Sequence, residues 1–493
     1  MIAELVLGIV FLFLLWRTFF RKPPGLPPGR WGLPLIGYIP LTMKTVEEQL
    51  HDMHKQYGDI FLWRMGTQVM VFLNDYKLTR AAFSSTDFIN RPDWTLFNFF
   101  EEKALGVAGS NDSQWKNNRR FSLRQLRDMG MGKSKLVAAV QTQATVLVKE
   151  LKKQAGEAKP FPHALNVTIV NVIWQMVGGQ QFDLTDPKLI EFERIMKDLF
   201  ASMVPFSVPD FLPWITYILP KYFLNHVFQY GFLEDAKERI LQFFFSEIEE
   251  HRATLDRDNP RDLIDGYLIE MDEKQVDPDV TCNDTDLSIL ILDLFLGGGE
   301  STKGILVWMS YYLATYPEVQ RRMQEEVDEV LPKGTLATLE DRIRLPYTEA
   351  VLHEVLRKSS LVNLGVQHVA VRDTELGGYI IPKGLIISSA AETMHHNPHY
   401  WDRPDEFLPE RWLDHEGKFT NSKKEGFLPF GVGKRSCLGE SLARMELLIF
   451  STALMQSLSF SHPPGKKIHL RPEPNNPFFR NPQMQDIVIT VRH

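Results

Sequence analysis

Cys437 is the residue whose surroundings point most directly to chemistry. It lies in the stretch PFGVGKRSCLG, residues 429–439, with Gly431 and Gly433 before it and Gly439 after it. Glycines lack side chains, so the backbone can approach a flat partner closely. The following residues have helical periodicity, which places Cys437 near a helix N-terminus, where free amides and the helix dipole favour the thiolate. With the cation of Arg435 two residues before it, this cysteine is suited to hold a metal from one side.

A second stretch, LFLGGGEST at residues 294–302, conflicts with its surroundings. The run from 287 to 313 is mostly apolar and predicts a core helix, in which each glycine costs roughly 1 kcal/mol relative to alanine. An unpaired acid on an apolar face costs more. A helix that nevertheless carries three glycines, Glu300 and the hydroxyls of Ser301 and Thr302 needs a chemical reason for them.

The first stretch is similar to a known loop. Its pattern F-x-x-G-x-R-x-C-x-G, residues 430–439, resembles the haem-binding loop of the cytochrome P450 family. The resemblance extends over nearly the whole chain, with the character of the microsomal class that includes drug- and steroid-oxidising enzymes. It implies that Cys437 is the proximal thiolate ligand of the iron of haem b, whose electron donation favours O–O cleavage. Phe430, Gly431 and Gly439 are the other haem-binding positions that it implies in this loop.

The same resemblance accounts for the glycine-rich stretch. Family members carry an Ala/Gly-Gly-x-Asp/Glu-Thr-Thr/Ser motif in the long helix that crosses the distal haem face, and residues 297–302 match it in order. The glycines are expected to open the helical hydrogen-bond ladder locally, making room for O2 and water. Glu300 is expected to supply protons, and a hydroxyl to relay them. Ser301 stands where threonine is usual, so Ser301 and Thr302 are both candidates for the relay.

Two segments supply donors for the carboxylates of a buried haem. The sequence WKNNRR places Trp115 and Arg119 four residues apart, hence on one face of a helix, and GVQHVAV contains His368. Buried propionates need cations or hydrogen-bond donors. The resemblance implies that Trp115, Arg119, His368 and Arg435 provide them. A lone histidine is more often a packed core residue, and that interpretation of His368 stays open.

Three charged residues are predicted to be structural. Glu354 and Arg357 lie at i and i+3 on one helical face. The family locks such a pair with an arginine from a later Pro-Glu-Arg segment, which here is Arg411. The resemblance therefore implies a scaffold for the haem loop rather than a chemical role.

Basic residues are also frequent around Arg119. A solvated helix face is one explanation. The resemblance implies another, because the family's corresponding helix lies where an acidic flavoprotein reductase docks, and such docking is salt-sensitive. The residues of this predicted docking surface are Lys116, Arg119, Arg120, Arg124, Arg127 and Lys434.

Three other sequence patterns do not predict chemistry. The cluster HHNPH, residues 395–399, could bind a metal, but the family has a similar His-and-Pro loop at this position. The phosphate-loop pattern is incomplete at GVGKRS, and the zinc-protease pattern is incomplete at HEVLR.

The elements that must position these residues belong to a large globular body. The chain has 493 residues, 44% of them hydrophobic and 24% charged, with a formal net charge of -7. These values describe a protein with a sizeable core and give no indication of nucleic-acid binding. The chain has 2 cysteines, Cys282 and Cys437, which exclude more than one disulfide and a thiol-rich zinc site. With so few cysteines in the chain, each one either has no special function or has a chemical role.

The first 40 residues predict attachment to a membrane. Residues 1–22 contain an apolar run and then basic residues, without a small-residue cleavage site, so they predict an uncleaved N-terminal anchor with the remaining chain in the cytosol. Residues 23–40 begin with PPGLPPG, which cannot continue a helix, and are expected to form a stiff hinge. By resemblance, the location is the endoplasmic reticulum membrane.

Residues 41–493 predict one haem-thiolate catalytic domain. Helical periodicity dominates, so the fold class is mostly α (α+β), with small peripheral β-sheets, as in the cytochrome P450 fold. Alternating segments predict hairpins at residues 59–75 and 377–389 and a terminal strand at 486–493.

Residues 200–244 are unusually rich in Phe, Tyr, Trp and Pro. Two interpretations are open. One is core packing. The other is an apolar lid that touches the membrane and lines an entry route for a lipophilic substrate.

Together the motifs predict a haem-thiolate monooxygenase that inserts one oxygen atom of O2 into a lipophilic substrate. Its electrons are expected to come from NADPH through NADPH–cytochrome P450 reductase, with cytochrome b5 as an optional donor. Two alternatives are a haem-thiolate isomerase that rearranges peroxides without a reductase and a non-catalytic haem-binding protein. The acid and alcohol retained at residues 300–302 favour the monooxygenase. The apolar contact positions do not distinguish a steroid, a terpenoid, a fatty acid or a foreign compound.

Overall fold

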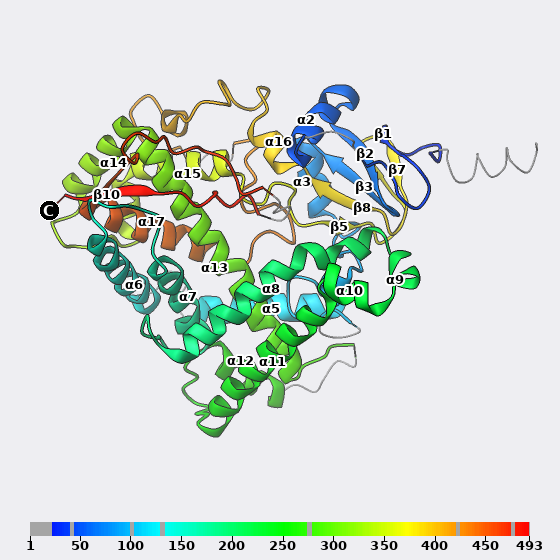
Figure 1. Cartoon of the computed structure of the whole chain (residues 1–493), viewed down its shortest axis with the longest axis horizontal. Helices are drawn as coiled ribbons and strands as arrows, with labels where there is room; N and C mark the ends of the chain where they lie inside the picture. Colours follow the sequence, from blue (N-terminus) through cyan, green and yellow to red (C-terminus); the bar gives the residue numbers. More distant parts are fainter. Residues whose placement is uncertain are drawn as a thin grey trace, which may run out of the picture.

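A computed structural model describes residues 22–39, 44–98, 103–128, 134–273, 279–420, 424–474 and 479–492. Helices dominate these ranges, and the sheets are small, which confirms the predicted fold class (Figure 1). The helices are α2 (Val46–Tyr57), α3 (Tyr76–Ser84), α4 (Thr95–Asn98), α5 (Asp112–Asp128), α6 (Ser134–Lys153), α7 (Ala164–Val177), α8 (Pro187–Phe211), α9 (Ile215–Ile218), α10 (Lys221–Val227), α11 (Tyr230–Ala253), α12 (Leu263–Glu273), α13 (Asp284–Thr315), α14 (Pro317–Val330), α15 (Pro346–Ser359), α16 (Ala391–His395) and α17 (Glu440–Ser457), with short 3-10 helices η1 (Glu340–Arg344) and η2 (Pro409–Trp412).

The strands form three sheets. A five-stranded sheet has the order β1-β2-β3-β8-β5, a three-stranded sheet has the order β4-β10-β9, and β6 pairs with β7. Their bounds are β1 (Gly29–Arg30), β2 (Ile60–Met65), β3 (Gln68–Leu73), β4 (Ala158–Lys159), β5 (His368–Val369), β6 (Thr374–Leu376), β7 (Tyr379–Ile381), β8 (Ile386–Ser389), β9 (Leu458–Ser461) and β10 (Ile487–Val491).

The structure confirms two of the β predictions and corrects the third. β2 and β3 form the hairpin expected at residues 59–75, and β10 is the expected terminal strand. The hairpin expected at 377–389 is wrong, because β7 pairs with β6 while β8 pairs in parallel with β3. The turn lies one segment earlier, where Gly377 and Gly378 both have positive φ (58° and 80°), as a two-residue hairpin loop requires.

α13 is the central helix of the molecule (Figure 1) and contacts α7, α11, α15 and α17. The side chain of Asn283 caps its start by accepting a hydrogen bond from Asp286 N at 2.9 Å. The segment is α-helical from Asp284 to Thr315 without interruption, so the expected local opening of its hydrogen-bond ladder is not observed. Gly297 provides room in another way, because a Cβ there would meet no atom within 4 Å.

The predicted anchor, residues 1–22, lies outside the described residues except for Lys22. Within the described part of the chain, no helix is long and apolar enough to cross a membrane. Part of the predicted hinge packs on the main sheet, where Leu26 is buried in a cluster with Ile60 and Leu62 and β1 pairs in parallel with β2. The division into anchor, hinge and catalytic domain stays a prediction.

The aromatic region at residues 200–244 divides into two parts. Its end helices contribute core residues such as Leu233 and Phe244. The connecting helices α9 and α10 instead expose large apolar side chains, with Tyr217 89% and Ile218 69% exposed. Core packing therefore explains the ends of the region and leaves its middle unexplained.

Candidate active site

The loop that carries Cys437 is held in a tight backbone conformation. Cys437 N donates a hydrogen bond to Phe430 O at 2.9 Å, and Lys434 N donates to Phe83 O at 3.1 Å. Gly433 has φ +83°, and a Cβ at this position would lie 2.0 Å from Phe83 O. Only glycine fits between the loop and the end of α3. α17 begins at Glu440, directly after the loop, as the sequence predicted.

Cys437 is an exposed residue, yet the protein atoms around its thiol displace solvent and raise its pKa. The backbone N–H of Gly439 and the charge of Arg119 lower the pKa, and the charge of Glu440 raises it. Arg119, rather than the expected Arg435, is thus the cation that favours the thiolate. Arg119 occupies this place because its guanidinium donates to Ser436 O at 2.9 Å, next to the thiol. Metal coordination would convert such a thiol to the thiolate.

Three arginines converge beside this loop from different elements. Arg91 lies before α4, Arg119 is on α5 and Arg435 is in the loop itself. They donate mainly to backbone carbonyl oxygens, and the shortest N···O distance is 2.6 Å for Arg435, 2.7 Å for Arg91 and 2.9 Å for Arg119. Burial and the neighbouring guanidinium charges lower the pKa of Arg91 to about 9 and that of Arg435 to about 8. The cluster therefore carries more positive charge than its protein surroundings compensate.

Trp115 joins these cations. The guanidinium carbon of Arg435 lies 4.2 Å from the centroid of its ring, and that of Arg119 lies 6.0 Å away. The indole Nε1 is buried and has no hydrogen-bond partner among the described residues. Leaving a buried donor unpaired costs about 1–3 kcal/mol. This N–H is therefore available to an acceptor on a bound group.

His368 is at the same place, on β5. Its Nδ1 lies 2.6 Å from Phe88 O, and its ring stacks on Phe83 with 4.0 Å between centroids. Burial, Arg91 and Arg435 hold its pKa well below the usual value, so the ring is neutral with the proton on Nδ1. A nearby carboxylate would favour a second proton on Nε2 and a hydrogen bond to that carboxylate.

These donors fit the two propionates of a haem. The predicted residues Trp115, Arg119, His368 and Arg435 all gather at one site, and Asp112 is the carboxylate whose charge reaches Arg435 there. Arg91, which sequence reasoning missed, belongs to the same cluster. It had no motif of its own, and only its proximity in space to Arg435 reveals it.

The three predicted residues of α13 have different surroundings. The Ser301 hydroxyl donates to Gly297 O at 2.7 Å, one turn back on the same helix. Glu300 forms an ion pair with Lys303, and the side chains are 24% and 28% exposed, respectively. Thr302 is buried and lies about 100° around the helix from Ser301, so it is not on the face that carries Gly297 and Ser301.

Thr302 contacts an acid that the sequence analysis missed. Its hydroxyl donates to Glu446 Oε2 of α17 at 2.9 Å. Burial raises the pKa of Glu446 to about 8, and its Oε1 has no partner in the described part of the chain. The sequence did contain a signal, because Glu446 interrupts the apolar segment MELLIF much as Glu300 interrupts α13.

The predicted structural triad is assembled as expected. Arg357 donates to both carboxylate oxygens of Glu354 at 2.7 and 2.9 Å, and Arg411 donates to Glu354 Oε1 at 3.1 Å. Trp412 Nε1 also donates to Glu354, at 3.0 Å. Glu354 and Arg357 are fully buried, and breaking such a pair typically costs about 3–5 kcal/mol.

The histidine cluster at residues 395–399 has a structural role at His395. Its Nε2 accepts a hydrogen bond from Leu428 N at 2.8 Å, and its Nδ1 lies 2.8 Å from Ser360 Oγ. Both ring nitrogens are therefore used within the protein. His395 connects the end of α15 to the segment that leads into the Cys437 loop.

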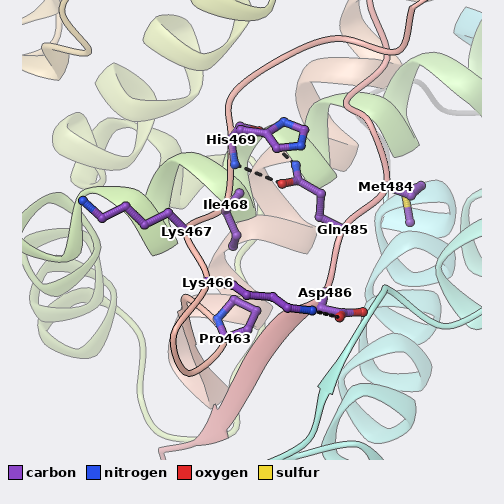
Figure 2. Close-up of a pocket in the computed structure, with 8 residues that line it drawn as sticks. All are labelled: Pro463, Lys466, Lys467, Ile468, His469, Met484, Gln485 and Asp486. Carbon is purple, nitrogen blue, oxygen red and sulfur yellow. Dashed lines mark hydrogen bonds and ion pairs between the residues drawn. The ribbon is translucent and has the colours of Figure 1, made fainter.

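A separate groove lies near the C-terminus, with a volume of about 500 Å³ (Figure 2). Gln485 Nε2 donates to His469 O at 2.9 Å, and Lys466 pairs with Asp486 at 4.0 Å, so these groups are already satisfied. None of its eight lining residues was predicted to be functional.

Comparison with known proteins identifies the family. The sequence profile described as Cytochrome P450 matches residues 27–488. The chain is 42% identical to cytochrome P450 2L1 of Panulirus argus, over 96% of each sequence. It is 35% identical to cytochrome P450 2J3 of Rattus norvegicus, over 95% of this chain and 92% of the relative. The chain belongs to the cytochrome P450 family.

Membership of this family defines the reaction class and the cofactors. This cytochrome P450 is a haem-thiolate monooxygenase that acts on a lipophilic small molecule. Its cofactor is haem b, and O2 and NADPH-derived electrons are its co-substrates. It receives the electrons from a redox partner.

Proposed function

We propose that Cys437 is the axial ligand of the haem iron and that the surrounding cation cluster binds the propionates. Arg119, Arg435, Trp115 and His368 are the propionate donors, together with Arg91. One observation supports this proposal above all: buried cations and an unpaired indole N–H gather beside a cysteine loop, where Asp112 is the one carboxylate among the described residues whose charge reaches Arg435. Phe430, Gly431 and Gly439 form the part of the loop that faces the macrocycle.

The bound haem supplies the one-electron and O2 chemistry of the reaction. The residues of this chain provide the protons and exclude water. Glu300 is partly exposed, so its carboxylate is accessible to solvent. The Ser301 hydroxyl, next to the open space at Gly297, passes a proton toward O2. Thr302 is the weaker candidate for the relay, because it is buried and its hydroxyl donates to the buried acid Glu446.

The ligand assignment is tested by the carbon monoxide difference spectrum of the reduced protein. Cys437→Ala is expected to abolish the thiolate-type band and NADPH-dependent product formation. Cys282→Ala is the matched control, because it removes the only other thiol, and it is expected to retain both. A normal thiolate spectrum from Cys437→Ala would overturn the assignment. Product formed from a substrate hydroperoxide without reductase would favour the isomerase alternative.

We propose NADPH–cytochrome P450 reductase as the redox partner, with cytochrome b5 as an optional donor. The supporting observation is the basic face of α5. Arg119 and Arg124 have partners within the chain. Lys434 is exposed in the Cys437 loop, so the basic surface extends to the proximal ligand. An acidic partner would dock there with salt-sensitive affinity.

We propose that the protein is attached to the endoplasmic reticulum membrane by residues 1–22 and also touches it with a second, apolar surface. Two segments distant in sequence expose large apolar side chains and contact each other, since Trp214 Nε1 donates to Leu35 O at 3.1 Å. The members of this surface are Leu33, Leu35, Ile36, Ile39, Tyr217, Ile218, Tyr222, Phe223 and Val227.

Binding to vesicles tests this apolar surface. A chain that lacks residues 1–22 is expected to bind phospholipid vesicles, and the double substitution Tyr217→Ser/Ile218→Ser is expected to weaken binding about tenfold or more, given about 25 cal/mol per Å² of apolar area. Ile343→Ser is the control, since Ile343 is 90% exposed but lies on η1, outside this surface. Equal binding by both variants would contradict the proposal.

A further inference from the structure

Arg480 is a largely buried cation of the C-terminal segment that the proposed mechanism does not use. Its side chain is 16% exposed and lies between two carboxylates from different helices. Arg480 Nη1 is 3.2 Å from Glu392 Oε1, on α16, and Arg480 Nε is 3.9 Å from Glu47 Oε1, on α2. Neither nitrogen forms a hydrogen bond with the described residues, so the attraction between opposite charges holds the guanidinium in place.

The backbone of Arg480 joins two segments that pack on α13. Arg480 N donates to Leu361 O at 2.8 Å, and Trp308 Nε1 of α13 donates to Arg480 O at 2.8 Å. Both segments meet α13 again at Gly304, where a Cβ would lie 2.6 Å from Asn481 Oδ1 and 3.2 Å from Leu361 Cδ1. The place of the two segments on α13 is therefore linked to the place of Arg480.

This contact lies on the helix face that carries the proposed proton relay. Gly297, Ser301 and Gly304 are at positions i, i+4 and i+7, which fall on one face of a helix. Gly304 is three residues beyond Ser301, about 4.5 Å along the helix axis. A Cβ at Gly297 would meet no atom within 4 Å, so this face is open at Gly297 and covered at Gly304. Leu361 and Asn481 consequently border the space beside Ser301.

Glu392 is the centre of the charge cluster. His51 Nε2, on α2, lies 2.9 Å from Glu392 Oε2, and His396 Nδ1 lies 3.2 Å from Glu392 Oε1. Burial raises the pKa of Glu392, but hydrogen bonds with both histidines and the nearby positive charges hold that pKa well below its usual value. The carboxylate is therefore ionised, as its role as the partner of several cations requires.

The same two carboxylates also hold the segment that contains Leu361. Asn363 in this segment is 2% exposed, and its Nδ2 donates to Glu47 Oε1 at 2.6 Å. Its backbone oxygen accepts a hydrogen bond from Glu392 N at 3.0 Å. Glu47 and Glu392 thus act on both segments that border the space beside the relay, on one through Arg480 and on the other through Asn363.

We propose that Glu392 and Glu47 are positioning residues that determine which substrates fit beside Ser301. They act on the substrate only through the two segments that they hold against α13. The proposal rests on the proposed function, since it takes the space beside Ser301 as part of the substrate site. A lipophile that extends to these segments gains packing contacts from them, whereas a small molecule bound at the iron does not.

Two ligands of haem iron test this proposal, and neither requires that the substrate be known. Imidazole is small, and 4-phenylimidazole extends further; both are titrated into the haem-loaded protein and followed by its absorption spectrum. Glu392→Gln is expected to weaken the binding of 4-phenylimidazole at least about threefold relative to imidazole. His54→Gln is the matched control, because His54 also lies on α2 and pairs with a carboxylate, Asp59 at 3.0 Å, outside the cluster.

Variants at other positions of the cluster decide the question if Glu392→Gln binds little haem. Glu47→Gln removes the second negative charge but retains an acceptor for Asn363, and it is expected to change the ratio of the two affinities in the same direction. Arg480→Lys keeps a cation and is expected to retain most of the wild-type ratio, which Arg480→Met is expected to lose. A ratio that rises, or that stays within about twofold of the wild type in both Glu47→Gln and Arg480→Met, would overturn the proposal.

Hydrogen exchange at the backbone N–H of Arg480 supplies a readout that needs no haem ligand. This N–H donates to Leu361 O, and its exchange is expected to accelerate at least about tenfold in Glu392→Gln and to stay unchanged in His54→Gln. Unchanged exchange in Glu392→Gln would overturn the proposal. A wild type whose spectrum responds to neither imidazole would refute the proposed haem site alone, since the exchange rate still decides whether the carboxylates hold the segments.

Discussion

At the scale of single residues, two acids that interrupt apolar helices in the same way lie in different environments. Glu300 and Glu446 both interrupt apolar helices, but only Glu300 was recognised, because it lies in a motif. The structure pairs Glu300 with Lys303 at the edge of solvent and buries Glu446 against Thr302. Periodicity places an acid on a helical face but does not identify the neighbouring helix, so the contact between Thr302 and Glu446 could not be predicted from it.

The two adjacent hydroxyls of α13 are expected to differ in their effect on coupling. Ser301→Ala should raise the release of hydrogen peroxide per NADPH more than Thr302→Ala, because Ser301 shares a face of α13 with the open space at Gly297, whereas Thr302 is buried against Glu446. Thr302→Ala should instead lower stability by about 1–3 kcal/mol, since it leaves Glu446 without its partner. Peroxide assays and denaturant unfolding of both variants measure the difference. Equal or reversed peroxide release would count against Ser301.

At the scale of elements, the sequence predicts what is local. The hairpin of β2 and β3 follows from alternation on both sides of one turn, and α14 follows from a proline at its first position. β7 and β8 were assigned to one hairpin because both alternate and are close in sequence. β8 instead pairs with β5 on one side and, on the other, with β3, more than 300 residues earlier. Strand pairing over such a distance leaves no local signature.

The Cys437 loop offers a matched pair of glycine variants. Gly431 and Gly433 both have positive φ, at 68° and 83°, but a Cβ meets no atom within 4 Å at Gly431 and lies 2.0 Å from Phe83 O at Gly433. Gly431→Ala should therefore cost the fold only the backbone strain, about 1–2 kcal/mol. Gly433→Ala should cost clearly more, because the loop must move away from α3. Denaturant unfolding of the two variants measures both, and equal losses of stability would refute the steric argument.

At the scale of the whole molecule, the site residues that the sequence predicted are those that belong to recognised motifs. Trp115, Arg119, His368 and Arg435 gather at one place, as the resemblance implied. Arg91 and Glu446 were missed because they reach the site only through the folding of distant segments. Arg435 was placed near the thiol by sequence distance, whereas its side chain turns to Ser110 O. Sequence separation does not determine side-chain direction.

The buried acid between α13 and α17 should make global stability depend on pH. The pKa of Glu446 is raised to about 8 in the fold, so the folded protein retains a proton that the unfolded chain releases near its ordinary pKa, about 4.3. Stability should consequently fall as pH rises between these values, by up to about 1.4 kcal/mol per unit from this group. Glu446→Gln should flatten the trend, which unfolding midpoints at pH 5, 6.5 and 8 would show.

The control for this experiment is an exposed glutamate. Glu329 is exposed on α14, so Glu329→Gln should leave the slope of stability against pH unchanged. If Glu446→Gln retained the slope of the wild type, Glu446 would be ionised in the folded protein.

The three-stranded sheet has a consequence for biosynthesis. β10 lies between β4 and β9 and pairs with both, yet roughly 330 residues separate β4 from β10, which a ribosome adds in about 15 to 65 s at 5–20 residues per second. During that interval the segment around β4 has emerged without its partner. β4 is only two residues long, so it can join a sheet only after β10 has been made, and the three-stranded sheet should be among the last parts of this cytochrome P450 to form.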